Sequence, residues 1–274
     1  MVHANGTDAP GAEPGDDVSK AAMIRKIIAA ILSLMLLAPL WAVAAGEHGH
    51  LDHAPINSND NASLQRGAKL FVNYCLNCHS ANYMRYNRLS DIGLNDKEIL
   101  ENLVFGEGKV GDLMKNTLDA KDAKVWFGVV PPDLTVIARS RASEAGAGAD
   151  WLYTYLRTFY RDPARPTGWN NTTFPNVGMP HVLWELQGEQ ELKGESVRGD
   201  GFMTTVDKPV LVKPGKLSAL EYDRAVGDLV NYLVYMGEPA ANNRKSIGLI
   251  VLAFLSGLIF LVYALKKEFW KDVH

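Results

Sequence analysis

Two cysteines and a histidine lie together in the stretch Cys75-Leu76-Asn77-Cys78-His79. These are the only 2 cysteines among the 274 residues of the chain. Two thiols three positions apart, followed directly by a histidine, have the spacing for covalent attachment of a c-type haem. Each thiol adds to one vinyl group of the porphyrin, and His79 then lies beneath the iron, where an imidazole nitrogen ligates it. The motif therefore predicts one covalently attached haem c.

Three other uses of this cysteine pair fit the sequence less well. A zinc site needs two further ligands, and neither another cysteine nor a closely spaced histidine pair follows the motif. A thioredoxin-like redox pair requires a βαβ context, which the sequence does not predict. A disulfide between residues three apart closes too small a loop to add much stability. Haem attachment is therefore the interpretation that we adopt.

A haem that carries electrons without binding small molecules needs a second axial ligand. Methionine raises the reduction potential of the iron, whereas a second histidine lowers it. Met179 has the most suitable context, because Gly178 and Pro180 predict a rigid loop that could deliver its thioether to the iron. His181 is the rival and would give a haem with two histidine ligands. The other methionines between the motif and the C-terminal apolar segment have weaker contexts: Met84, Met114, Met203 and Met236.

Haem also brings two propionates into a pocket of low dielectric, where they need cations as partners. Arg139 and Arg141 follow a turn predicted at Pro131-Pro132 and are the candidates for this role. The alternative, that both arginines are simply solvated, is equally compatible with the sequence.

Two amphipathic segments are expected to position the motif. The first begins near Ser63 and places Gly67 and Phe71 in a helix that leads to the cysteines. The second follows a capping box and carries Leu229 and Tyr232 at helical spacing. A glycine inside a helix costs about 1 kcal/mol relative to alanine, so Gly67 suggests close approach of another helix. The two segments resemble the crossing in single-haem c-type cytochromes, where an N-terminal helix with a glycine and an aromatic residue crosses a C-terminal helix with leucine and tyrosine. The resemblance implies that they cross, although periodicity alone also allows two unrelated helices.

The intervening chain predicts a mainly α domain with long loops. Further helices are expected after Asn95 and from Asp150, whereas alternation within 185–217 suggests a short strand or hairpin. The polar segment Gly46–Asn61 contains histidines, and we interpret it as a solvated arm rather than a metal site.

The N-terminal segments carry the features of protein export. Residues 1–22 are poor in apolar side chains and are expected to be disordered. Residues 23–45 combine a basic start, an apolar run and the small-residue box Ala42-Val43-Ala44, which together predict a secretory signal peptide cleaved near Ala45. An uncleaved anchor is the alternative, and Met23 is the expected translation start. Residues 46–243 would then form the exported domain.

Near the C-terminus, residues 247–265 contain no charged side chain. A helix of this length spans about 28 Å, close to the hydrocarbon thickness of a bilayer. We therefore predict a transmembrane helix over 246–265 and a cytoplasmic tail over 266–274, with the haem domain on the far side of a bacterial inner membrane. The net charge of −3 gives no indication of nucleic acid as a partner.

Several stretches resemble the cytochrome c1 family of proteobacterial ubiquinol–cytochrome c reductase, and the resemblance covers roughly residues 60–274. The gap of 100 positions between His79 and Met179 also fits this family. Residues 1–22 and the detail of 185–217 fall outside the resemblance. The stretches that carry it are CLNCHSANYMRYNRL (75–89), WFGVVPPDLTVIARSR (126–141), DWLYTYLRTFYRDPARPTGWN (150–170), FPNVGMP (174–180) and LKKEFWKDVH (265–274).

The resemblance implies a c-type cytochrome domain with long loop insertions and one C-terminal anchor. Cys75 and Cys78 would hold the haem, His79 and Met179 would ligate its iron, and Arg141, with Arg139, would meet a propionate. Partners would be cytochrome b and the Rieske iron–sulfur protein in a dimeric complex, with cytochrome c as the electron acceptor.

The chain itself would then be no enzyme but an electron-transfer subunit of an oxidoreductase. Two alternatives stay open at this point. One is a membrane-anchored cytochrome c that carries electrons to a terminal oxidase, and the other is a haem sensor or peroxidase-like protein with an open sixth site.

Overall fold

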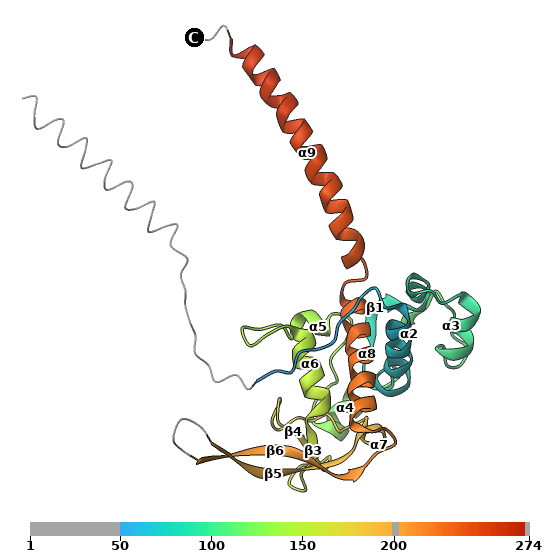
Figure 1. The fold of residues 1–274 in the computed structure, drawn as a ribbon. Coiled ribbons are helices and arrows are strands. Elements are labelled where there is room, and N and C mark those ends of the chain that lie inside the picture. Colours follow the sequence, from blue (N-terminus) through green and yellow to red (C-terminus); the bar gives the residue numbers. More distant parts are fainter. Residues whose placement is uncertain (1–49, 199–202, 272–274) are drawn as a thin grey trace, which may run out of the picture. The chain divides into compact units, whose positions relative to one another are not determined.

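A computed structural model describes residues 50–198 and 203–271 of the chain (Figure 1). All of these residues belong to the unit His48–His274. The predicted N-terminal extension 1–22, the predicted signal peptide 23–45 with its cleavage site, and the end of the tail lie outside the described residues. The predictions for those segments therefore stay predictions.

Helices dominate the described chain, which confirms the predicted mainly α class. Short non-α helical turns are η1 (Phe71–Cys75), which is a π-helix, and η2 (Tyr86–Ile92), which is a 3₁₀-helix. The α-helices are α2 (Asn61–Leu70), α3 (Asp96–Asn102), α4 (Ala120–Phe127), α5 (Ile137–Ser140), α6 (Gly148–Arg157), α7 (Trp184–Gln187), α8 (Ala219–Gly237) and α9 (Ala241–Phe269).

Strands form three small antiparallel pairs. The last of them is a long hairpin, with Gly188 opposite Pro214 at its base and Arg198 opposite Met203 at its outer end. The hairpin predicted within 185–217 is thereby confirmed, and it is longer than expected. The pairs are β1 (Ala81–Arg85) with β2 (Leu113–Met114), β3 (Phe159–Arg161) with β4 (Trp169–Asn171), and β5 (Gly188–Arg198) with β6 (Met203–Pro214).

The centre of the domain is the crossing of α2 and α8 (Figure 1). At the crossing point a Cβ atom on Gly67 would collide with the carbonyl oxygen of Asp228 and with the Cβ of Tyr232. Phe71 packs on Tyr232 with ring centroids 5.6 Å apart, and both side chains are fully buried. The predicted crossing is confirmed, and Gly67 is needed because the two backbones touch there.

The segment before α2 corrects one expectation. Residues predicted to form a solvated arm instead pack on the domain: the Asp52 amide donates to Thr154 Oγ1 at 2.8 Å, and the Ala54 amide donates to Asp150 Oδ1 at 2.8 Å. Ala54 is only 2% exposed. The prediction was wrong here because it rested on the polarity of the segment. The backbone amides, which composition does not reveal, make the contacts.

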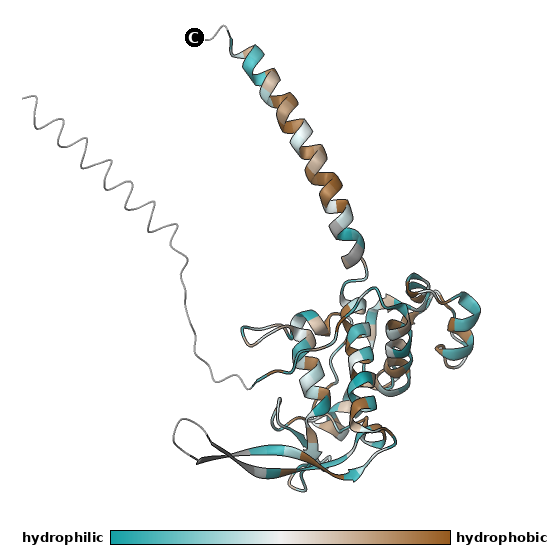
Figure 2. Ribbon diagram, in the orientation of Figure 1, coloured by the Kyte–Doolittle hydropathy of each residue, from teal (hydrophilic) through white to brown (hydrophobic). Residues whose placement is uncertain are grey.

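Helix α9 contains one stretch, Ser246–Phe269, that is long and apolar enough to cross a membrane, and it is the one such helix in the described parts of the chain. Figure 2 shows apolar residues along its middle and polar residues at both ends. None of this stretch is buried against the rest of the protein. A 24-residue apolar helix with no protein partner fits a membrane span, whereas a soluble core helix would be covered.

Candidate haem-binding site

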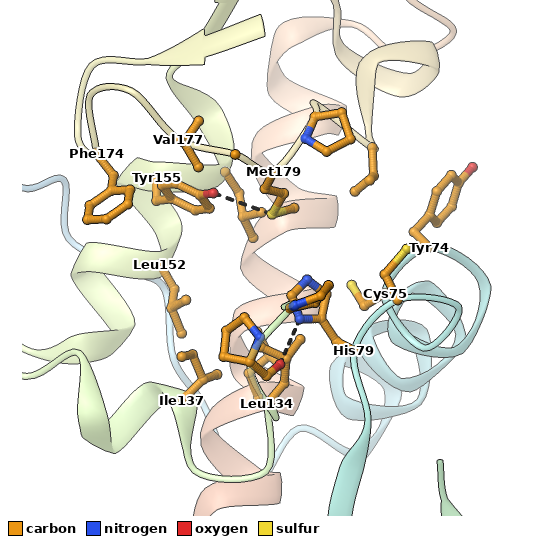
Figure 3. Close-up of a pocket in the computed structure, with 18 of the residues that line it drawn as sticks. Tyr74, Cys75, His79, Leu134, Ile137, Leu152, Tyr155, Phe174, Val177 and Met179 are labelled. Atoms are coloured by element: carbon orange, nitrogen blue, oxygen red, sulfur yellow. Dashed lines mark hydrogen bonds between the residues drawn. The ribbon is translucent and has the colours of Figure 1, made fainter. Parts of the chain in front are cut away.

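A cavity of about 370 Å³ lies within the helical domain. Its walls come from η1, α5, α6 and α8 and from the two loops 128–134 and 174–182 (Figure 3). The lining is mainly aliphatic and aromatic, with a few polar groups, and its volume is typical of sites for cofactors and other small molecules.

The predicted attachment motif borders this cavity directly. Helix α2 changes to π-helical geometry at η1, where the Leu76 amide donates to the Phe71 carbonyl at 3.0 Å. Such single π turns often occur at functional sites. Cys75 is buried and Cys78 is half-buried, and both carry free thiols facing the same cavity. Burial raises the pKa of Cys75 to about 12, so this thiol is protonated at neutral pH.

His79 presents one defined ring nitrogen to the cavity. Its Nδ1 lies 2.8 Å from the carbonyl oxygen of Pro132. A carbonyl only accepts hydrogen bonds, so Nδ1 carries the proton and Nε2 keeps its lone pair. Burial lowers the pKa of His79, which also favours the neutral ring. A neutral imidazole with its second nitrogen held by a carbonyl is the usual form of a histidine metal ligand.

The turn that supplies this carbonyl is itself anchored. The Asp133 carboxylate accepts the Thr135 amide at 2.9 Å and the Asn82 amide at 2.7 Å. The Leu134 amide donates to the Ser80 carbonyl at 2.9 Å, next to the motif. From the sequence, Pro131-Pro132 was predicted only to form a turn before Arg139 and Arg141. This turn orients His79 through a contact between residues 53 positions apart. A local sequence pattern gives no information about such a distant contact.

Asn116 is a second residue that the sequence did not single out. Its side-chain amide donates to the Cys78 carbonyl at 2.5 Å, and its Oδ1 accepts from Ser80 Oγ at 2.9 Å. The first bond holds the backbone of the motif, and the second holds the side chain of the residue that follows it. No signal in the sequence marks this asparagine, because isolated asparagines in loops are common.

Met179 reaches the cavity from the loop 174–182, on the other side from His79. In Figure 3 its side chain and that of His79 point into the cavity from different sides. Gly178 allows this approach, because a Cβ there would lie 2.9 Å from the Phe127 carbonyl oxygen. The hydroxyl of Tyr155 donates to the Met179 sulfur at 3.3 Å.

The rival ligand His181 does not line the cavity. Its ring is only 2% exposed and stacks on Phe159, with centroids 4.9 Å apart and planes inclined by 5°. Trp169 packs on it edge-on at 5.1 Å. Burial lowers the pKa of His181 to about 4, so the ring is neutral and behaves as a core aromatic.

The other candidate methionines do not line the cavity either. Three of them are core residues with at most 2% exposure, and Met203 lies at the start of β6. The core residues are Met84, Met114 and Met236.

The two candidate arginines occupy different places. Arg141 lines the cavity, with its guanidinium 4.4 Å from the centroid of Trp151 and 5.4 Å from that of Phe174. It has no carboxylate partner in the described part of the chain, so a negatively charged group of a ligand could pair with the guanidinium. Arg139 is exposed and its aliphatic stem faces Gly237 instead.

The model of the Cytochrome C1 family matches residues 51–198 and 213–273, most of the chain. The chain belongs to the cytochrome c1 family. The match includes all of β5 but leaves out residues 199–212, which include most of β6.

Individual relatives agree with this assignment. The chain is 50% identical over 252 residues to a protein named cytochrome c1 from Allochromatium vinosum, covering 92% of this chain and 100% of that protein. It is 51% identical over 249 residues to a protein named ammonia monooxygenase gamma subunit from Nitrosomonas europaea, covering 91% and 100%. A protein named cytochrome b/c1 from Bradyrhizobium diazoefficiens is 25% identical over 255 residues, covering 80% of this chain and 34% of that protein.

Membership of the cytochrome c1 family implies haem c and a membrane anchor. The residues around the cavity fit that group: two thiols at its wall, a neutral imidazole with a free Nε2, a thioether, and an unpaired guanidinium. A porphyrin supplies four of the six ligands of a cytochrome iron, so the imidazole and the thioether would be sufficient to complete the site.

Proposed function

We propose that this chain is the haem c subunit of a ubiquinol–cytochrome c reductase and relays one electron from the Rieske iron–sulfur protein to cytochrome c. The observation that supports the proposal most strongly is the donor set around one apolar cavity. His79 and Met179 face it, and both thiols of the motif border it. Haem c bound there would supply a one-electron ferric–ferrous couple.

In this proposal Cys75 and Cys78 would form the thioether links, and His79 and Met179 would ligate the iron. The hydrogen bond to the Pro132 carbonyl orients His79 and fixes its tautomer, while burial favours the neutral ring, so that Nε2 is available before the group arrives. The thioether of Met179 favours the reduced iron and raises the potential, as a carrier that accepts electrons from a Rieske centre requires. The mainly apolar walls would limit access of water, and with Met179 as second ligand no coordination position would remain for small molecules.

Arg141 is the residue that we assign to a propionate. Its guanidinium has no acidic partner in the structure described, and the rings of Trp151 and Phe174 hold it at the cavity. A partly desolvated carboxylate is stabilised by such a cation. Arg139 does not line the cavity, and its predicted contact with a propionate stays a prediction.

The proposed location rests on the predicted signal peptide and on helix α9, and the proposed assembly rests on a relative. We propose that residues 23–45 direct export and are removed, that 46–243 lie in the periplasm, and that α9 anchors the protein in lipid of the inner membrane. The Bradyrhizobium relative named cytochrome b/c1 supports assembly with cytochrome b. The complete assembly would include the Rieske protein and would be dimeric.

Other functions have less support from the structure. The Nitrosomonas relative carries a name from ammonia oxidation, but the cavity of this chain has the donor set of an electron carrier. A haem sensor or peroxidase-like protein would need an open sixth site, whereas Met179 lines the cavity and would occupy that site in our proposal. A carrier that serves a terminal oxidase has the same donor set and is separated from our proposal only by its partners.

Purification through this chain in mild detergent tests the proposal. We expect cytochrome b and a Rieske protein to co-purify, and haem to remain on the denatured polypeptide because it is covalently held. Reduction of the chain by ubiquinol should be lost when the Rieske protein is removed and restored when it is added back. Isolation of the chain alone or with an oxidase would contradict the assignment.

A further inference from the structure

Tyr155 in α6 has a hydroxyl that contacts the candidate ligand Met179. The O–H donates to the Met179 sulfur at 3.3 Å, as the dashed line in Figure 3 shows. The side chain lines the cavity and the residue is only 8% exposed. The hydroxyl has no second hydrogen-bond partner in the described chain. A buried phenol normally finds a partner, and here the partner is the weak acceptor sulfur.

The ring of Tyr155 is held firmly, so its hydroxyl has little freedom to turn elsewhere. Trp151, one helical turn earlier, stacks on it at 4.8 Å with planes inclined by 12°. Phe159 packs on it edge-on at 5.0 Å. The backbone is also fixed, because the side-chain amide of the fully buried Asn171 donates to the Tyr155 carbonyl at 2.7 Å. The donor is therefore in place before the thioether meets a metal.

We propose that Tyr155 is a positioning residue that orients the Met179 thioether and raises the reduction potential of the site. This inference rests on the proposed function, in which Met179 is an axial ligand. A thioether sulfur has two lone pairs, so one can face the iron while the other accepts the Tyr155 proton. The hydrogen bond withdraws electron density from the sulfur, which weakens its donation to ferric iron more than to ferrous iron.

The test is Tyr155→Phe in the purified, haem-loaded complex. Removing one hydroxyl leaves the ring and its stacking unchanged, so the protein should retain its haem. We expect the equilibrium to shift toward the oxidised form by about three- to tenfold, where tenfold corresponds to about 59 mV for a one-electron couple. Added imidazole should also displace the methionine at lower concentration, because the thioether loses a fixed orientation.

Two matched controls lie close by. Tyr153→Phe removes a hydroxyl from the same helix, but Tyr153 does not line the cavity and its ring packs under Arg157. Tyr222→Phe removes a buried tyrosine bond of 2.8 Å to the Leu156 carbonyl, which supports α6 without reaching Met179. We expect both controls to keep the wild-type potential and imidazole sensitivity. An equal shift in Tyr222→Phe would mean that α6 stability, not the sulfur contact, sets the potential.

A second measurement covers the case in which Tyr155→Phe does not accumulate. Incorporation of 3-fluorotyrosine at position 155 makes the phenol a stronger donor, and we expect the potential to rise rather than fall. In that case an unchanged potential in the 3-fluorotyrosine protein would refute the inference.

The ligand role of Met179, on which the proposed function depends, can be tested separately from the role of Tyr155. If the wild-type protein lacks the long-wavelength absorption band of a methionine-ligated haem, Met179 is not the ligand. If the band is present and Tyr155→Phe leaves the potential unchanged, only the role of Tyr155 is wrong.

Discussion

His79 and Met179 come from segments 100 positions apart, and each is prepared for its role by a different neighbour. A backbone carbonyl fixes the tautomer of His79, whereas a glycine lets the loop of Met179 come close to the wall of the cavity. Neither residue depends on the other for its position. If both residues ligate the iron as we propose, two ligands are held ready on separate loops, and this would limit the reorganisation needed when the iron changes charge.

Replacement of Met179 by leucine tests the ligand assignment at the residue scale. Leucine has nearly the same volume, so the cost in stability should stay below about 1.5 kcal/mol while the thioether is lost. We expect the long-wavelength band to disappear, the potential to fall and carbon monoxide to bind the reduced protein. Met114→Leu is the control, since Met114 is fully buried in the core and away from the cavity. A retained band in Met179→Leu would point to another ligand.

The two arginines offer a matched pair. Arg141→Gln removes a cation from the cavity, and the site then stabilises the more positive ferric state, so the potential should fall. A change of about fivefold in the redox equilibrium, or about 1 kcal/mol, is reasonable for one partly screened charge. Arg139→Gln removes the same charge from an exposed position two residues earlier and should change the potential much less. Equal effects of the two substitutions in a redox titration would argue against a propionate contact at Arg141.

At the scale of elements, the crossing of α2 and α8 connects the haem motif to the rest of the core. The helices touch at Gly67, and one turn later Phe71 packs on Tyr232. The motif follows within the next turn, so any shift of α2 moves the two thiols. Across the cavity, α6 contributes Tyr155 and packs on α8 as well. Helix α8 thus serves as the common support for both sides of the site.

Gly67→Ala tests this arrangement. The added methyl would collide with the Asp228 carbonyl, and backbone at a helix crossing cannot move aside cheaply, so we expect a loss of about 1–3 kcal/mol or more. A lower unfolding temperature and incomplete haem attachment should follow. Gly111→Ala is the control, because nothing lies within 4 Å of a Cβ at that position. Similar unfolding temperatures for the two variants would show that the crossing tolerates separation.

At the scale of the whole molecule, a haem domain and one apolar helix are joined by a short turn after α8. The candidate membrane span in α9 is 24 residues long, and its most apolar part is not covered by protein. In water so large an apolar surface would aggregate, whereas in a bilayer it is solvated by lipid. The domain does not need α9 for its core, because the residues that build the cavity all precede Ala241.

A chain that ends at Ala240 tests this separation. We expect the shortened protein to appear in the soluble periplasmic fraction, with haem attached and an unchanged spectrum. Replacement of α9 by an alternating leucine–alanine helix of equal length should return it to the membrane, since apolar length decides insertion. Recovery of the shortened chain in salt-washed membranes would show that another surface of the domain holds it there.

Features that depend on short stretches could be predicted from the sequence: the helices on either side of the crossing and the apolar helix at the end. The attachment chemistry of CLNCH rests on the same kind of local spacing and stays a prediction. Each depends on spacing along a few turns of chain, where geometry follows directly from residue type. Gly67 was also predictable, because a helical glycine needs a packing reason.

The tertiary structure alone decided which side chains face the cavity. It places Met179 there and buries His181 between two aromatic rings. It also places Arg141 at the cavity and Arg139 outside it. It also supplies the Pro132 carbonyl to His79 and the Tyr155 hydroxyl to Met179. These contacts join residues up to 53 positions apart, and the packing of helices and loops determines them. Local sequence patterns describe each segment by itself and therefore contain no record of the partner.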